Sequence, residues 1–181
     1  MRTILKGFAA ALVALLVYVA VEQGGGEPHG VPSASGGAPG IGSAVRGRAH
    51  VVDADTLDIA GVRVRLHGID APERDQNCTR SGVAWRCGQQ ASAALAALVA
   101  GRDLRCELSD RDRYGRMVGI CWLDALDVNG WLVQQGWAVA YRRFSAAYVG
   151  AEAVAREARR GIWAGTFTMP EEYRRSQTSA R

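Results

Sequence analysis

Lysine is nearly absent from this sequence of 181 residues, because every basic residue after Lys6 is arginine. Arginine suits planar, bidentate contacts to phosphate better than lysine does, although a biased genome composition explains the same usage equally well. A large excess of one charge is also missing. The formal net charge of +4 excludes a histone-like tail but still favours a polyanionic partner.

Internal repeats are absent too. No segment of about 33 to 50 residues recurs, which excludes a solenoid or another repeat array. With 48% apolar residues, the chain is not a disordered polymer either. Its length is enough for one ordinary hydrophobic core. The sequence therefore predicts a single small domain with attachments.

The first attachment is the N-terminal segment 1–21, where Arg2 and Lys6 precede an unbroken apolar run over residues 7–21. As a helix this run spans roughly 22 Å, which is shorter than the roughly 30 Å hydrocarbon core of a bilayer and favours a signal peptide. Cleavage after Ala20 would place the bulky Tyr18 where a small residue is preferred, so an uncleaved membrane anchor stays open. The protein is accordingly expected to be exported, either periplasmic or secreted, or anchored to the membrane.

The second attachment is the segment 22–44, which holds eight glycines and three prolines mixed with serine. Its apolar residues follow no helix or strand periodicity, and this composition is typical of a flexible, disordered linker. The globular part is expected over residues 45–175, followed by a short tail at 176–181.

The four cysteines are not expected to bind zinc, because neither neighbouring pair has metal-ligand spacing and no histidine lies near them. Behind an export signal, an even number of cysteines indicates two disulfides. Three pairings are open, and the local one, Cys78 with Cys87 and Cys106 with Cys121, is the simplest. Each local bridge would contribute about 3 kcal/mol in the chain-entropy model.

The pattern of the globular part reads as strands first and helices second. An extended segment over 51–59 is followed by the turn Ala60–Gly61 and an alternating strand over 62–66, with a bulge or bend expected near Asp55. A second hairpin is expected from 105–108 and 118–123. Helices are predicted over 89–100, 128–135 and 148–160. This order predicts an α+β domain, plausibly a small barrel.

The acidic residues of the first hairpin suggest a metal site. The return of the hairpin can bring Asp55 and Asp70 together, and paired carboxylates with backbone carbonyls and water suit calcium or magnesium. Arg65 and Arg116 could then clamp a phosphate. The simpler interpretation is that the aspartates cap turns and the arginines are solvated, and spacing alone does not decide between the two.

Three motifs carry a resemblance to a known family: VDADT at 52–56, RLHGIDAPE at 65–73, and YGR at 114–116. Together they resemble the staphylococcal nuclease (thermonuclease) family, over about residues 45–175. The resemblance implies a five-stranded oligonucleotide-binding-type β-barrel with three helices. It also implies a bound Ca²⁺ and endonucleolytic hydrolysis of DNA and RNA to products that end in 3′-phosphate.

Carried over residue by residue, the resemblance makes Asp55, Asp70 and the backbone carbonyl of Ala71 calcium ligands. Glu73 becomes the general base that takes a proton from the attacking water. Ala71 stands where the best-known member has threonine, which is harmless if only its carbonyl binds the metal. Ala54 stands where the family usually has glycine, which could shift the bend near Asp55.

The same resemblance gives Arg65 and Arg116 the task of holding the phosphate and stabilising its developing charge. Tyr114 and Tyr141 are candidates for phosphate or base contacts. The alternative is that each ring packs in the core and exposes only its hydroxyl to water. Arg111 and Arg113 are expected in ion pairs with neighbouring aspartates, and Trp85 is the tryptophan expected to meet a base.

These features favour an exported, monomeric, calcium-dependent nuclease that acts on nucleic acid. Two alternatives stay open: a catalytically inactive nucleic-acid-binding module of the same fold, and an envelope-anchored scaffold. Retention of Glu73 beside the arginines argues against both.

Overall fold

A computed structural model describes residues 39–179 of the chain. The predicted signal or anchor segment and residues 22–38 of the predicted linker lie outside the described residues. Among residues 39–179, no helix combines the length and apolarity needed to cross a bilayer. β1 starts at Ala44, and the N–H of Gly42, within the predicted linker, already donates to Leu108 O at 2.7 Å.

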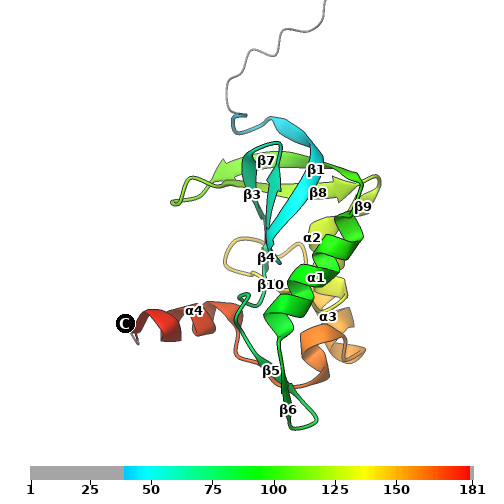
Figure 1. The fold of residues 1–181 in the computed structure, drawn as a ribbon, viewed down its shortest axis with the longest axis vertical. Helices are drawn as coiled ribbons and strands as arrows, with labels where there is room; N and C mark the ends of the chain where they lie inside the picture. The colour runs from blue at the N-terminus through cyan, green and yellow to red at the C-terminus, as the bar shows by residue number, and fades with distance from the viewer. Residues whose placement is uncertain (1–38, 180–181) are drawn as a thin grey trace, which may run out of the picture. The chain divides into compact units, whose positions relative to one another are not determined.

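Five strands close into a barrel (Figure 1). Their order is β3-β2-β1-β7-β8, and a parallel pairing of β3 with β8, which sets Val64 opposite Met117, closes the ring. Along β8 the buried side chains alternate strictly with partly exposed ones, as expected where one face points into the barrel. The predicted five-stranded α+β barrel is therefore confirmed. The strands are β1 (Ala44–Asp53), β2 (Thr56–Ile59), β3 (Val62–Leu66), β7 (Asp103–Arg111) and β8 (Met117–Leu123).

The segment expected to run extended over 51–59 is two strands rather than one. The chain reverses at Ala54 and Asp55, and the register shifts between Val51 and Asp53, so the predicted bend is a full hairpin turn. Both turn residues are buried, at 1% and 6% exposure. The reversal lets Leu57 point into the core while Asp55 points to a different surface, which one regular strand does not permit.

The three predicted helices are present as α1 (Cys87–Val99), α2 (Val128–Gln134) and α3 (Val149–Glu157). A short 3₁₀ turn follows at Gly161–Ala164. α1 packs against β1, and α2 packs against both β8 and α3 (Figure 1). Asp127 caps α2, because its carboxylate accepts the N–H of Gly130 at 3.0 Å.

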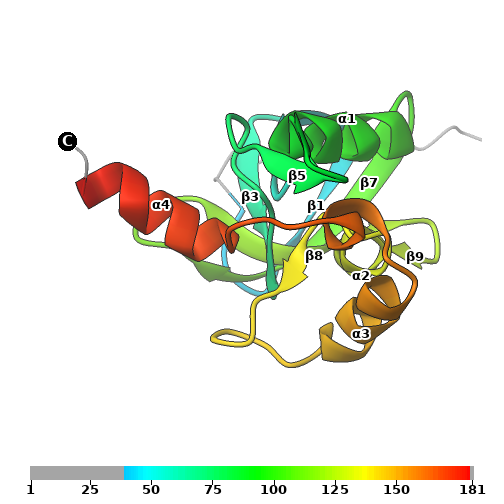
Figure 2. The same cartoon turned by 90° about the horizontal axis from the view of Figure 1, so that it is seen from below.

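A fourth helix, α4 (Pro170–Ser179), corrects the expected count of three and occupies most of the segment that was expected to be a tail. Its sequence is polar and lacks an apolar period, although Pro170 in the first turn and the acidic residues that follow are ordinary helix-start signals. Figure 2 shows α4 projecting beyond the rest of the described fold. Of the described residues of α4, only Pro170 is buried.

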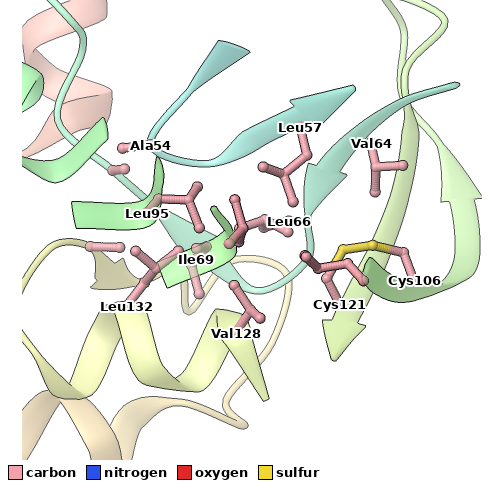
Figure 3. Packing of buried hydrophobic residues seen from close by; sticks show 14 of the residues in the cluster. Ala54, Leu57, Val64, Leu66, Ile69, Leu95, Cys106, Cys121, Val128 and Leu132 are labelled. Carbon is pink, nitrogen blue, oxygen red and sulfur yellow. A yellow bond between two sulfur atoms is a disulfide. The ribbon is translucent and has the colours of Figure 1, made fainter. Parts of the chain in front are cut away.

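The core forms where the helices meet the barrel (Figure 3). Leu95 of α1 and Leu132 of α2 are fully buried with Leu57 and Leu66 of the barrel strands. Full burial of such side chains contributes about 1.5 to 3 kcal/mol each. The disulfide between Cys106 and Cys121 crosses from β7 to β8 inside this cluster.

The second disulfide joins Cys78 to Cys87, so the structure contains both local pairings. It closes the hairpin of β5 (Cys78–Arg80) and β6 (Val83–Trp85) onto the start of α1. Cys78 and Cys87 belong to a second, smaller apolar cluster, and Trp85 packs against it. The guanidinium of Arg80 lies 4.8 Å from the ring centroid of Trp85. Trp85 is not among the residues that line the groove described below, and its contact with a base stays a prediction.

We expect Gly136→Ala to lower the free energy of unfolding by about 3 kcal/mol. Gly136 has a φ of +73°, and a Cβ there would lie 2.3 Å from the carbonyl oxygen of Arg160. The matched control is Gly101→Ala, where φ is +69° but nothing lies within 4 Å, so it carries only the backbone cost of about 1 kcal/mol. Urea unfolding with an unchanged m-value measures both. Equal losses in the two variants would show that the contact with Arg160 is not tight.

Candidate active site

A groove of about 1400 Å³ runs along one side of the barrel between the β7–β8 turn and α4. Asp70 lies beneath its floor, at 1% exposure. The other predicted site residues line it, namely Asp55, Arg65, Ala71, Glu73, Tyr114, Arg116 and Tyr141. The fold therefore gathers the predicted set at one groove, with Asp70 buried under the residues that line it.

Two backbone pairings place Asp55 and Asp70 side by side. The N–H of Leu66 donates to the carbonyl of Asp55 at 2.8 Å, which ties the β1–β2 turn to the end of β3. β4 (Ile69–Asp70) then pairs with β10 (Val139–Ala140), which sets Asp70 opposite Val139. The link between β3 and β4 is fixed by the buried Asn129, whose amide donates to the carbonyl of His67 at 3.0 Å.

Arg65 joins the two aspartates. Its Nη1 lies 3.0 Å from Oδ2 of Asp55, and its Nη2 lies 3.0 Å from Oδ1 of Asp70. The side chains are 18%, 8% and 1% exposed, respectively, so this is a nearly buried network rather than a surface ion pair. The second oxygen of Asp55 accepts the hydroxyl of Thr56 at 2.9 Å. Such networks are rigid because each charged atom has a defined partner.

Arg174 of α4 completes the network from the far end of the chain. Its Nη2 lies 2.9 Å from Oδ2 of Asp70 and its Nη1 lies 2.8 Å from Oε1 of Glu73. From the sequence alone, Arg174 belongs to a set of basic residues that could extend a nucleic-acid track, and it is not predicted in the active site. The one available signal was the arginine pair at 174 and 175 after a helix start, and it resembles an ordinary solvated surface.

Burial is the largest influence on the pKa of both Asp70 and Glu73. It raises the pKa of Asp70 above its ordinary value, against the hydrogen bond and charge of Arg174. Burial also raises the pKa of Glu73, again opposed by Arg174, while the charges of Asp55 and Asp70 add to the rise. A carboxylate with a raised pKa is a better proton acceptor near neutral pH. Glu73 is 35% exposed, so water can reach it.

The donor set fits a hard divalent cation. Asp55 and Asp70 offer adjacent buried carboxylates, and oxygen donors of this kind suit calcium or magnesium. Three carboxylates against the guanidiniums of Arg65 and Arg174 leave a formal surplus of negative charge. Over residues 39–179, no cluster of three or more His, Cys, Asp or Glu side chains is arranged as a metal site. The role of the Ala71 carbonyl stays a prediction.

Arg116 lies on the opposite wall and does not touch the carboxylates. Asp112 holds it through Nε at 2.7 Å and Nη2 at 2.6 Å. Burial acts to raise the pKa of Asp112, but hydrogen bonds from Arg116 and from the Tyr114 N–H outweigh it and lower the pKa below its ordinary value. Arg116 is therefore held in place by a charged partner while it faces the groove.

The expected ion pairs of Arg111 and Arg113 are not formed in the described part of the chain. The guanidinium of Arg113 instead lies 4.8 Å from the ring centroid of Tyr114 and donates to its hydroxyl at 2.7 Å, and Arg111 donates to the carbonyl of Gly115. The reason is that the carboxylate of Asp112 accepts hydrogen bonds from the backbone N–H and the guanidinium of Arg116, at the end of the β7–β8 turn. Tyr114 is 70% exposed, which does not fit a core ring.

Tyr141 belongs to the same groove. It follows β10, and its N–H donates to the carbonyl of Gly68 at 2.9 Å. Its ring meets Phe144 edge to face, with centroids 4.9 Å apart. The two predicted tyrosines therefore stand at separate parts of the groove wall, one on the β7–β8 turn and one beside β10.

Comparison with known proteins assigns the chain to a family. Residues 63–165 match the family described as staphylococcal nuclease homologue. The succinoglycan biosynthesis protein ExoI of Rhizobium meliloti is 44% identical over 128 residues, which cover 68% of this chain and 67% of that protein. Protein ParB of Escherichia coli is 34% identical over 149 residues, covering 72% and 79%. An uncharacterized endonuclease of Escherichia coli O157:H7 is 32% identical over 127 residues, covering 66% and 77%. The chain belongs to the staphylococcal nuclease homologue family.

Proposed function

We propose that the chain is an exported, calcium-dependent endonuclease that hydrolyses phosphodiester bonds of DNA and/or RNA to products ending in 3′-phosphate. The observation that carries this proposal is the network along one groove in which Arg65 joins Asp55 to Asp70 and Arg174 joins Asp70 to Glu73. Relatives from Escherichia coli and Haemophilus influenzae are named endonucleases, and one from Oryza sativa is named a probable staphylococcal-like nuclease. These names support a nuclease.

Each residue has a task in this reaction. Glu73 accepts a proton from water, whose oxygen attacks phosphorus as the P–O5′ bond breaks, and the 5′ oxygen leaves and takes a proton from solvent water. Arg65 and Arg116 bind the phosphoryl oxygens from two sides and stabilise the charge that develops on them. Tyr114 and Tyr141 contact the phosphate or the bases of the bound strand. A calcium ion held by Asp55, Asp70 and the carbonyl of Ala71 would act as a Lewis acid.

Export rests on two observations of different kinds. The apolar run at 7–21 follows basic residues, and the chain contains two disulfides, which persist in oxidising compartments. The run serves as a signal peptide or as an uncleaved anchor. We propose that the protein acts as a monomer.

The test is digestion of labelled single-stranded DNA and RNA by the full-length, unreduced protein, with calcium or with a chelator. We expect cleavage that requires calcium, and fragments that release inorganic phosphate from their 3′ ends on phosphatase treatment. Asp70→Asn should need far more calcium for the same rate, whereas the exposed Asp124→Asn should behave as the parent does. A protein that retards DNA on a gel but never cuts it would instead be the inactive binding module.

A further inference from the structure

The C-terminal helix α4 is attached to the rest of the fold mainly through polar contacts. Pro170 is its one buried residue within the described chain, and Glu171 pairs with Arg143 at 3.7 Å. α4 also lies beyond residues 63–165, the part that matches the family. The guanidinium of Arg174 nevertheless lies in the groove and pairs with both Asp70 and Glu73.

A buried amide fixes the start of this helix relative to Glu73. The side chain of Gln76 is fully buried, and its Nε2 donates to the carbonyl of Thr168 at 2.7 Å. Its Oε1 accepts the backbone N–H of Glu73 at 3.2 Å, and its own N–H donates to the Glu73 carbonyl at 2.8 Å. One side chain therefore ties the backbone of Glu73 to the chain that leads into α4.

The start of α1 packs closely against the loop that carries Glu73. A Cβ at Gly88 would lie 1.7 Å from the carbonyl oxygen of Glu73, so only glycine permits this approach. The backbone of Glu73 is thus held by Gln76 and enclosed by Gly88, and what remains free is the rotation of its side chain. Arg174 takes one carboxylate oxygen, Oε1, in a charge-assisted hydrogen bond.

We propose that Arg174 is a positioning residue of the active site, and that α4 is the element that delivers it. By holding Oε1 of Glu73 and Oδ2 of Asp70 in one planar fork, Arg174 fixes the Glu73 carboxylate so that Oε2 faces the groove and the water it deprotonates. The inference rests on the proposed function. A guanidinium suits this task because its donors have a fixed geometry, which the single ammonium of lysine lacks.

The first test is the kinetics of Arg174→Ala in the full-length protein. Loss of a group that orients another catalytic group typically costs about 10- to 100-fold in activity, and we expect this loss in kcat with KM changed less than about threefold. Free guanidinium at low concentration should restore part of the rate, and Arg174→Lys should fall in between. The charge-matched control is Arg102→Ala, which removes an exposed arginine paired with Asp124 outside the groove.

The second test is a double-mutant cycle with Glu73→Gln. If Arg174 acts through Glu73, removing it in the Glu73→Gln background should change the residual rate less than about twofold. A rate of Arg174→Ala equal to or above the parent's, or a change in KM alone, would overturn the inference. A parent protein that cuts no nucleic acid would instead defeat the proposed function. Circular dichroism of each variant separates these outcomes from misfolding, and Arg174→Lys keeps the test usable if Arg174→Ala does not fold.

Discussion

Glu73→Gln should lower kcat for DNA cleavage by about 10²- to 10⁴-fold while leaving the affinity for DNA within a few-fold of the parent value. The amide keeps the shape of the side chain and still offers an oxygen to Arg174 Nη1, but it cannot accept a proton from water. Burial raises the pKa of Glu73, so the parent carboxylate is a stronger base than an exposed one. Single-turnover cleavage and fluorescence anisotropy of a labelled strand measure the two quantities separately.

The matched control for this variant is Glu107→Gln. Glu107 lies on β7, is 54% exposed and pairs with Arg105 away from the groove, so the same chemical change there should leave kcat unaltered. Cleavage by Glu73→Gln at a rate within threefold of the parent's would contradict the assignment of Glu73 as general base. The acceptor of the proton would then have to be sought among the other groove carboxylates.

The first hairpin of the barrel could be predicted from the residues because its signals are local, whereas the five-stranded barrel was implied only by the family resemblance. Val62, Val64 and Leu66 alternate with polar residues, and Ala60–Gly61 gives a turn of the right length. The reversal at Ala54–Asp55 was expected only as a bend. A buried turn that carries an acidic side chain has no ordinary turn composition, because its residues are selected for the site rather than for the loop.

The hairpin and the motifs predicted the meeting of Asp55, Arg65 and Asp70, since these residues are close in the chain. Arg174 could not be predicted in the same way. It lies 101 residues from Glu73, on a helix without an apolar period, and its place depends on the Gln76 amide. Long-range contacts of this kind have no local sequence signal. The prediction for the partner of Asp112 was wrong for a related reason: the geometry of the turn brings Arg116, rather than the nearer arginines, to the Asp112 carboxylate.

Arg65→Ala should destabilise the metal-free protein by about 3 kcal/mol, because it leaves the buried carboxylate of Asp55 without its guanidinium and leaves Asp70 with Arg174 alone. Asp55 and Asp70 are 8% and 1% exposed in this network, so solvent screens their repulsion poorly. Arg105→Ala is the control: its partner Glu107 is 54% exposed, and loss of such a surface pair should change stability by less than about 0.5 kcal/mol. Urea unfolding in chelator measures both.

Calcium distinguishes the cause of this loss. A cation bound by Asp55 and Asp70 would replace the missing positive charge, and any ligand that binds only the folded state stabilises it. Millimolar calcium should therefore raise the free energy of unfolding of Arg65→Ala by at least about 1 kcal/mol more than that of the parent, while DNA cleavage stays impaired because the phosphate has lost a guanidinium. Equal gains from calcium in the two proteins would mean that Arg65 and the cation do not share the two aspartates. Unimpaired cleavage by the variant would remove Arg65 from the set that holds the phosphate.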